Sequence, residues 1–147
     1  MIDETFTEWR PRLLRFCGQL LRNTHDAEEV VQDVFAKLLR QDGRYDLAKD
    51  PGVLLFRLAR NRCIDLRRKL HPAATPDLDV AAREERPHLE LAAALASLPF
   101  AEREVLLLTT VDGLGYREVK EILGCSLGTV AARRFTAIQK LQQRLSP

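Results

Sequence analysis

The chain has 147 residues, of which 46% are hydrophobic and 30% are charged, and its formal net charge at pH 7 is +2. These values suit a soluble protein of one domain or two small ones, and the small net charge does not by itself indicate a nucleic-acid partner. No apolar run approaches the roughly 20 residues needed to cross a bilayer, and the acidic N-terminus does not resemble a secretory leader, so we expect a cytoplasmic protein without membrane insertion.

Cysteine and histidine patterns argue against disulfides and a metal site. The residues are Cys17, Cys63, Cys125, His25, His71 and His88. The cysteines are odd in number and embedded in apolar stretches, which favours reduced core thiols, and the histidines lack the spacing of metal ligands. No phosphate-cradling glycine loop and no nucleophile with an adjacent base can be identified. We therefore expect no metal, no cofactor and no enzymatic activity.

A first helix is predicted from Phe6 to Leu21, where apolar residues recur at helical spacing. Pro11 leaves two alternatives for its start. Either the regular helix begins there, with proline in its first turn, or a kink separates a short N-terminal piece.

The second predicted helix has the clearest apolar stripe in the chain. Asp26, with Glu29 three residues later, forms a capping-box-like start. The stripe comprises Ala27, Val30, Val31, Val34, Phe35, Leu38 and Leu39. Acids and amides near the N-terminal end, including Gln32 and Asp33, favour the positive end of the helix dipole, and binding of a partner is the alternative explanation for them.

The third predicted helix has a strong start signal, because Asp50 is a good N-cap and Pro51 suits the first helical position. It follows a loop-like stretch from Gln41 to Lys49 and extends to about Leu70. Its predicted buried residues are Leu55, Phe56, Ala59, Cys63, Leu66 and Leu70. Interlocking stripes on the three helices predict one bundle.

Basic residues are concentrated on this third helix, where Asp65 is the single acid between Arg57 and Lys69. The bases are Arg57, Arg60, Arg62, Arg67, Arg68 and Lys69. We expect them to point outward, with Arg60 and Arg67 flanking the main row. Such a surface suits a negatively charged strand, although a basic helical face is more often simply solvated.

The stretch from His71 to Pro87 contains prolines, alanines and acids without a sustained period, which indicates a linker. A second cluster of helices is predicted from near Leu89. It is interrupted by Pro99 and resumes from Glu104 to Val111. The apolar residues of its first part are Leu91, Ala94, Leu95 and Leu98.

The part from Leu114 to Leu145 has the pattern of a helix-turn-helix. An apolar period from Tyr116 to Leu123 stops at Gly124, a residue type that easily adopts the left-handed conformation at a helix end, and Ser126 is placed to cap a second helix. The apolar stripe of that helix is Leu127, Val130, Ala137, Ile138, Leu141 and Leu145. Its other face carries Thr129, Arg133, Thr136 and Lys140. The pattern predicts either a DNA reader or two packed helices with a solvated polar face.

Together these elements predict an all-α chain of two small helical domains. The N-terminal domain is a three-helix or four-helix bundle over residues 1–71, the linker covers 72–88, and the helix-turn-helix domain covers 89–147.

Three segments carry a resemblance to a known family: HDAEEVVQDVFAKLLR at 25–40, FRLARNRCIDLRRK at 56–69, and LASLPFAEREVLLLTTVDGLGYREVKEILGCSLGTVAARR at 95–134. In this order they resemble the small bacterial sigma factors of the extracytoplasmic-function (ECF) type, within the sigma-70 family. The likeness spans nearly the whole chain. It implies that the first segment docks on the clamp helices of RNA polymerase, the second meets the upstream edge of the promoter bubble, and the third reads the minus-35 element.

The resemblance also implies roles for individual residues. The polymerase-binding residues are Asp26, Glu29, Gln32 and Asp33. The minus-10 DNA-binding residues are Arg57, Arg60, Asn61, Arg62, Arg67 and Arg68. The minus-35 DNA-binding residues are Ser126, Thr129, Arg133 and Arg134. The implied partners are core RNA polymerase, through its clamp helices and flap, and promoter DNA. The habit of the family implies an anti-sigma factor as well, although no residue identifies one.

The chain departs from the family pattern at several positions. Ala131 and Ala132 stand where many members carry a basic residue and a serine, so the reading helix is less charged. Gly115 replaces the usual serine or threonine cap. Arg134 lies on the apolar stripe and must reach outward or face DNA. No tryptophan occurs between Asp50 and Phe56, where members often have one.

We therefore expect a sigma factor that binds core RNA polymerase and directs promoter-specific initiation. Two alternatives belong to other classes. A stand-alone helix-turn-helix regulator would need only the C-terminal half. A sigma mimic that binds an anti-sigma factor would keep the fold while losing DNA contacts, and the thin charge at Ala131 and Ala132 is its support.

Overall fold

The computed structural model describes residues 2–41, 50–70 and 90–145, and the regular elements in these ranges are all helical. The N-terminal half comprises α1 (Ile2–Leu21), α2 (Thr24–Arg40) and α3 (Pro51–Leu70). The C-terminal half comprises α4 (Glu90–Ser97), α5 (Phe100–Leu106), the π-helical segment η1 (Leu107–Val111), α6 (Tyr116–Leu123) and α7 (Leu127–Leu145). The all-α prediction is confirmed. The predicted linker at 72–88 and the loop at 42–49 lie outside the described residues.

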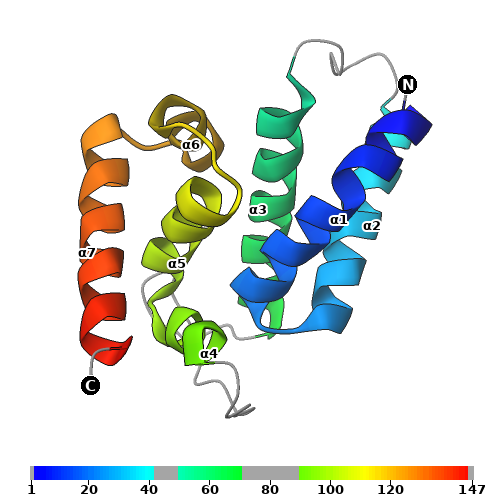
Figure 1. Cartoon of the computed structure of the whole chain (residues 1–147). Coiled ribbons are helices and arrows are strands. Elements are labelled where there is room, and N and C mark those ends of the chain that lie inside the picture. Colours follow the sequence, from blue (N-terminus) through cyan, green and yellow to red (C-terminus); the bar gives the residue numbers. More distant parts are fainter. Residues whose placement is uncertain (1, 42–49, 71–89, 146–147) are drawn as a thin grey trace.

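The two halves pack against each other in one body. Figure 1 shows α1, α2 and α3 together as a bundle, with α5 lying between that bundle and α7. One continuous core cluster contains residues from both halves, among them Phe16, Phe56, Phe100, Leu108 and Val119. The apolar stripes of the N-terminal helices therefore pack against those of the C-terminal helices in one core.

Helix α1 runs through Pro11 as one element, so neither predicted alternative for its start describes it. Proline lacks the backbone N–H that a helix interior uses, so Pro11 cannot donate an intrahelical hydrogen bond. The helix nevertheless continues on both sides of it. Close packing fixes α1 against the start of α3. A Cβ atom added at Gly52 would lie 2.8 Å from Cη2 of Trp9, so only glycine allows the two helices this approach.

Helix α2 begins before the predicted capping box. Asn23 is the N-cap, with extended backbone angles, and its side-chain oxygen accepts from the backbone N–H of Asp26 at 3.0 Å. The predicted Asp26 and Glu29 box is therefore wrong, because Asn23 already satisfies the donor at this helix end. Asp26 lies in the first turn instead.

The C-terminal half resumes earlier than the sequence indicated. Helix α5 begins at Phe100, directly after Pro99, rather than at Glu104. The start of this helix was not predicted because three of its first residues, Glu102, Arg103 and Glu104, are charged and do not extend an apolar stripe. All three are nevertheless buried. Most of their partners are distant in sequence, so no local pattern marked them as interior positions.

Several predicted stripe residues are exposed. They are Phe6, Leu39, Leu70, Leu91, Val111, Tyr116, Leu127 and Leu145. Most stand at or near the end of a helix, where the apolar period continues but no neighbouring element covers the side chain. The remaining members of the α2 stripe, from Ala27 to Leu38, are buried as predicted.

The cysteines agree with the expectation of core thiols in two of three cases. Cys17 and Cys63 are buried free thiols, whereas Cys125 is half-buried. Burial raises the pKa of the Cys63 thiol well above its ordinary value, which keeps it in the less reactive protonated form.

Candidate functional site

The helix-turn-helix has the caps predicted from the sequence. Gly124 ends α6 in the left-handed conformation, with φ 68° and ψ 37°. Ser126 then caps α7, because its Oγ accepts from the backbone N–H of Thr129 at 3.1 Å. Gly115 caps α6 through its backbone alone, and its N–H donates to Oε1 of Glu118 at 3.1 Å. These contacts fix the angle at which α7 leaves the turn.

Some side chains of the predicted DNA-reading helix α7 already contact other residues of the protein. The hydroxyls of Ser126 and Thr129 lie 2.9 Å apart at the start of the helix. Arg134, which was expected to reach outward or face DNA, instead donates from Nε to Oγ1 of Thr109 in η1 at 3.3 Å. Lys140 pairs with Glu102 at 2.9 Å.

Exposed side chains on α7 include some that the sequence analysis passed over. Ala131 and Ala132 are both exposed, so the two positions where many family members carry a basic residue and a serine lie on the surface here. Phe135 is 64% exposed on the same helix, although it was not singled out from the sequence. An aromatic residue flanked by polar neighbours on a predicted reading helix was the available signal.

The docking face, defined as Asp26, Glu29, Gln32 and Asp33, lies on α2. Glu29 and Gln32 are exposed, and Asp26 and Asp33 are half-buried. Asp33 accepts from Nε of Arg62 at 2.9 Å, which joins the acidic face of α2 to the basic helix α3. The face therefore presents carboxylates and an amide at the surface on one side of the bundle.

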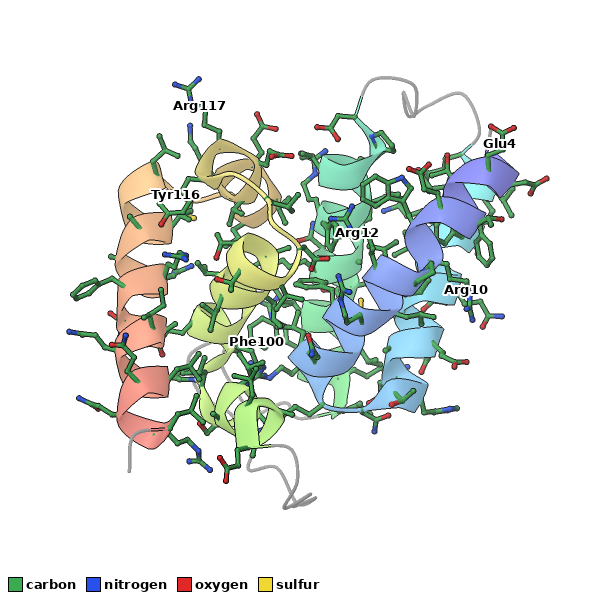
Figure 2. The ribbon with its side chains drawn as sticks, viewed as in Figure 1. Glu4, Arg10, Arg12, Phe100, Tyr116 and Arg117 are labelled. Carbon is green, nitrogen blue, oxygen red and sulfur yellow. The ribbon has the colours of Figure 1, made fainter. Side chains whose placement is uncertain are left out.

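The basic face, defined as Arg57, Arg60, Asn61, Arg62, Arg67 and Arg68, is divided by the packing of the two halves. Arg57, Asn61 and Arg68 are exposed, as expected. Arg60 and Arg67 instead turn toward the C-terminal half, which corrects the expectation that they point outward. The guanidinium carbon of Arg67 lies 4.7 Å from the ring centroid of Phe100, which Figure 2 shows between the two halves.

Arg60 makes a two-pronged ion pair with Glu104 of α5. Its Nε lies 2.9 Å from Oε2 of Glu104, and its Nη2 lies 3.2 Å from Oε1. The carboxylate side chain is 1% exposed, and the arginine side chain is 18% exposed. Burial raises the pKa of Glu104, while hydrogen bonding to Arg60 and the charges of Arg60, Arg133 and Arg103 act to lower it. The buried Glu104 carboxylate is thus hydrogen-bonded to an arginine of the N-terminal half, and the charges of two arginines of its own half favour its ionised form.

Asp112 forms a second polar contact between the halves. Nη2 of Arg15 lies 3.1 Å from Oδ1 of Asp112, and Nε of Arg12 lies 3.5 Å from the same oxygen. Arg12 also donates to the Asp112 carbonyl at 3.1 Å, and Figure 2 shows Arg12 on the side of α1 that faces the C-terminal half. Burial raises the pKa of Asp112 against the opposing influence of the two arginines.

Arg103 is the largest fully buried side chain, and the sequence analysis missed it. It donates to the carbonyl of Leu98 at 2.6 Å and to the carbonyl of Leu20 at 2.8 Å. Leu20 lies in the last turn of α1, where carbonyl groups lack helical partners and a cation is favoured. Arg103 therefore ties the start of α5 to the end of α1.

The part of the chain that the structure describes contains neither a candidate metal site nor a candidate membrane span. Among those residues, no group of three or more histidine, cysteine or acidic side chains is placed to hold a metal ion. None of the described helices combines the length and apolarity that a membrane span requires. The absence of a metal and a cofactor stays a prediction.

Comparison with known proteins identifies both halves. Residues 5–72 match the family Sigma-70 region 2, and residues 88–141 match Sigma-70, region 4. The ECF RNA polymerase sigma factor SigE of Mycolicibacterium smegmatis is 30% identical over 98% of this chain, which spans 61% of that protein. The ECF RNA polymerase sigma factor ShbA of Streptomyces griseus is 31% identical over 90% of this chain and 81% of its own length.

The fold is also similar to that of a solved structure. The sigma factor RpoE from Bartonella quintana, in complex with the anti-sigma factor NepR, superposes with a TM-score of 0.81 at 23% identity. The match covers 97% of this chain and 95% of that one. The chain therefore belongs to the ECF sigma factors of the sigma-70 family.

Proposed function

We propose that the chain binds core RNA polymerase and directs promoter-specific initiation of transcription, while polymerase carries out the chemistry. The observation that carries the proposal is the separation of charged faces on different helices of one sigma-type fold. The acidic docking face lies on α2, the basic face on α3, and the capped helix-turn-helix presents α7. The chain itself has no enzymatic activity in this proposal and acts in the cytoplasm.

The docking face is the proposed contact with the polymerase clamp helices. Glu29 and Gln32 are exposed there, so both are available to a partner without rearrangement of α2. Asp33 is already hydrogen-bonded to Arg62, so we assign it a role in orienting the face as well as in contact. Contact of the C-terminal half with the polymerase flap is the second proposed attachment.

Promoter DNA is the second proposed partner. The exposed Arg57, Asn61 and Arg68 suit a single strand, because guanidinium groups neutralise phosphates and an amide can contact base edges. Arg60, Arg62 and Arg67 complete the proposed minus-10 set. On α7 the proposed minus-35 contacts are Ser126, Thr129, Arg133 and Arg134, with the serine near phosphate at the helix N-terminus.

Transcription in vitro with purified core enzyme tests the proposal. A library of promoter fragments is offered to core polymerase with and without the chain, and the chain should support transcripts that depend on the promoter. Failure to bind core and failure to direct any transcript would refute the proposal.

The two alternatives predict different results in binding measurements. A stand-alone regulator would bind duplex DNA without core and would tolerate Glu29→Ala. A sigma mimic would bind an anti-sigma factor while Arg133→Ala leaves all DNA binding unchanged. Ala131 and Ala132, both exposed, are the residues that favour the mimic, and an anti-sigma partner is compatible with the sigma function too.

A further inference from the structure

Arg134 differs from the neighbouring basic residues of α7 in what its side chain meets. Lys140 pairs with the Glu102 carboxylate at 2.9 Å, and the charge of Arg133 acts on the buried Glu104. Arg134 is half-buried too, but no carboxylate of the residues that the structure describes is paired with it. Its positive charge therefore lies at the surface without a counter-ion from this part of the protein.

A neutral hydroxyl fixes the direction of the Arg134 side chain. Oγ1 of Thr109 donates to the carbonyl of Val105 at 2.8 Å, and it accepts from Nε of Arg134 at 3.3 Å. A hydroxyl has one hydrogen to donate and two lone pairs to accept, so the bond to Val105 orients the lone pairs toward the arginine. Binding through Nε leaves the terminal Nη1 and Nη2 groups, whose parallel donors match two oxygens of a phosphate.

The π-helical turn η1 determines where Thr109 lies. The backbone N–H of Asp112 donates to the carbonyl of Leu107, five residues earlier, at 2.9 Å. A π turn holds more residues than an α-helical turn, so it shifts the side chains that follow relative to α5. Leu108 is buried, Thr109 is half-buried and Thr110 is exposed. The turn thus places the Thr109 hydroxyl at the edge of the core, facing α7, and π turns occur frequently at functional sites.

We propose that Thr109 is a positioning residue, which orients the guanidinium group of Arg134 toward a phosphate of promoter DNA. A phosphate supplies the negative charge that the protein does not place beside this arginine. Helix α7 as a whole is complementary to DNA in charge, because it contains no acidic residue and four basic ones, Arg133, Arg134, Lys140 and Arg144.

This inference rests on the proposed function, in which α7 contacts the minus-35 element, and it adds Thr109 to that contact. It also assigns Arg134 to the DNA backbone rather than to the bases, so Arg134 contributes affinity and orientation but no sequence preference.

The test measures binding of the full chain to a short labelled duplex of random sequence, by fluorescence anisotropy at several salt concentrations. A random duplex reports phosphate contacts and requires no known promoter. The variants are Thr109→Val, Thr109→Ser, Arg134→Ala and the combination of Thr109→Val with Arg134→Ala. Thr110→Val is the matched control, because it removes a hydroxyl from the next, exposed position of η1. Urea unfolding measures the stability of each variant.

Arg134→Ala should reduce the salt slope by about 0.9, the value for one phosphate. Thr109→Val should lower the affinity for the duplex roughly threefold or more and reduce the slope by a smaller amount, because Arg134 is retained but no longer oriented. Thr109→Ser keeps the hydroxyl and should restore both quantities. In the Arg134→Ala background, Thr109→Val should cause no further loss of affinity. Thr110→Val should bind as wild type does.

A merely structural role of Thr109, through its bond to Val105, would lower the free energy of unfolding without this dependence on Arg134. Equal losses of DNA affinity from Thr109→Val with and without the arginine would therefore overturn the proposal. Salt slopes that stay at the wild-type value in both Arg134→Ala and Thr109→Val would overturn it too.

Arg134→Lys provides a second test if Thr109→Val fails to fold. Lysine keeps the charge, but its single terminal nitrogen cannot hold Thr109 and present two parallel donors to a phosphate at once. Affinity for the duplex should fall as in Thr109→Val, and wild-type affinity in Arg134→Lys would contradict the positioning role.

Binding of core polymerase and transcription by wild type are measured in parallel. The expected losses of DNA affinity, found in a chain that neither binds core nor directs a transcript, would sustain the phosphate contact and refute the proposed function. Transcription by wild type, together with variants that bind the duplex as wild type does, would refute the role of Thr109 alone.

Discussion

The charged faces of α2 and α3 belong to one bundle but have different surroundings. On α2, Glu29 and Gln32 lie at the surface beside solvent. On α3, Arg60 is 18% exposed and enters an ion pair with a carboxylate of the other half. A charged side chain predicted to bind a partner can therefore be either available or already occupied, and its position on the helix does not distinguish the two.

The largest effect is expected where the boundary between the halves is most buried. Arg103→Ala removes two hydrogen bonds to carbonyl groups and leaves a cavity in place of a side chain that is 1% exposed. Unfolding in urea should show a loss of about 3–5 kcal/mol. The exposed Arg117→Ala on α6 serves as the control and should change stability by less than about 0.5 kcal/mol. A loss near that control value would show that Arg103 does not tie α5 to α1.

Substitutions in the docking face should change the affinity for core polymerase rather than the free energy of unfolding. Glu29→Ala removes an exposed carboxylate of α2, so core polymerase affinity should fall by about 1–3 kcal/mol while the free energy of unfolding stays nearly constant. Glu28→Ala is the matched control, because Glu28 is an exposed acid of the same helix outside the docking face. Equal losses for Glu28 and Glu29 would mean that general charge, not the docking face, attracts polymerase.

Because the Glu104 carboxylate is buried, the stability of the folded chain should depend on pH. Because burial raises the folded-state pKa of Glu104 above its usual value of 4.5, the folded protein binds the proton more tightly than the unfolded chain does. This contribution to stability is fully present below pH 4.5 and is lost as pH rises through the raised pKa. Wild type should therefore lose stability relative to Glu104→Gln over that window. Parallel unfolding profiles for the two proteins would contradict the direction of this pKa shift.

The smallest expected effect lies on the reading helix. Ala131→Lys adds a positive charge at an exposed position of α7, so promoter affinity of the holoenzyme should rise a few-fold and the salt slope should steepen by about 0.9. Thr7→Lys adds the same charge on α1, far from α7 in the sequence, and should leave the slope unchanged. A slope that responds equally to both changes would place Ala131 away from the DNA.

Local patterns explain which features could be predicted from the sequence. The α2 stripe, the start of α3 at Pro51 and the Gly124 turn each depend on residues within a few positions of one another, and the structure confirms them. The polar contacts between the two halves join residues 44 and 100 positions apart, so helical periodicity does not indicate them. Charged residues inside the short helix α5 were the available clue, because an ionic side chain is buried only when it is paired.

The central claim of the proposed function is that Arg60 contacts promoter DNA in the holoenzyme, although Glu104 pairs with this arginine in the free chain. The direct measurement is the effect of Arg60→Ala on DNA affinity, determined once for the free chain and once for the chain bound to core enzyme. We predict no loss in the free chain, where Glu104 occupies the arginine, and a loss of about 1–3 kcal/mol in the holoenzyme. An equal loss in both states would contradict the claim, because Arg60 would then be available to DNA in the free chain.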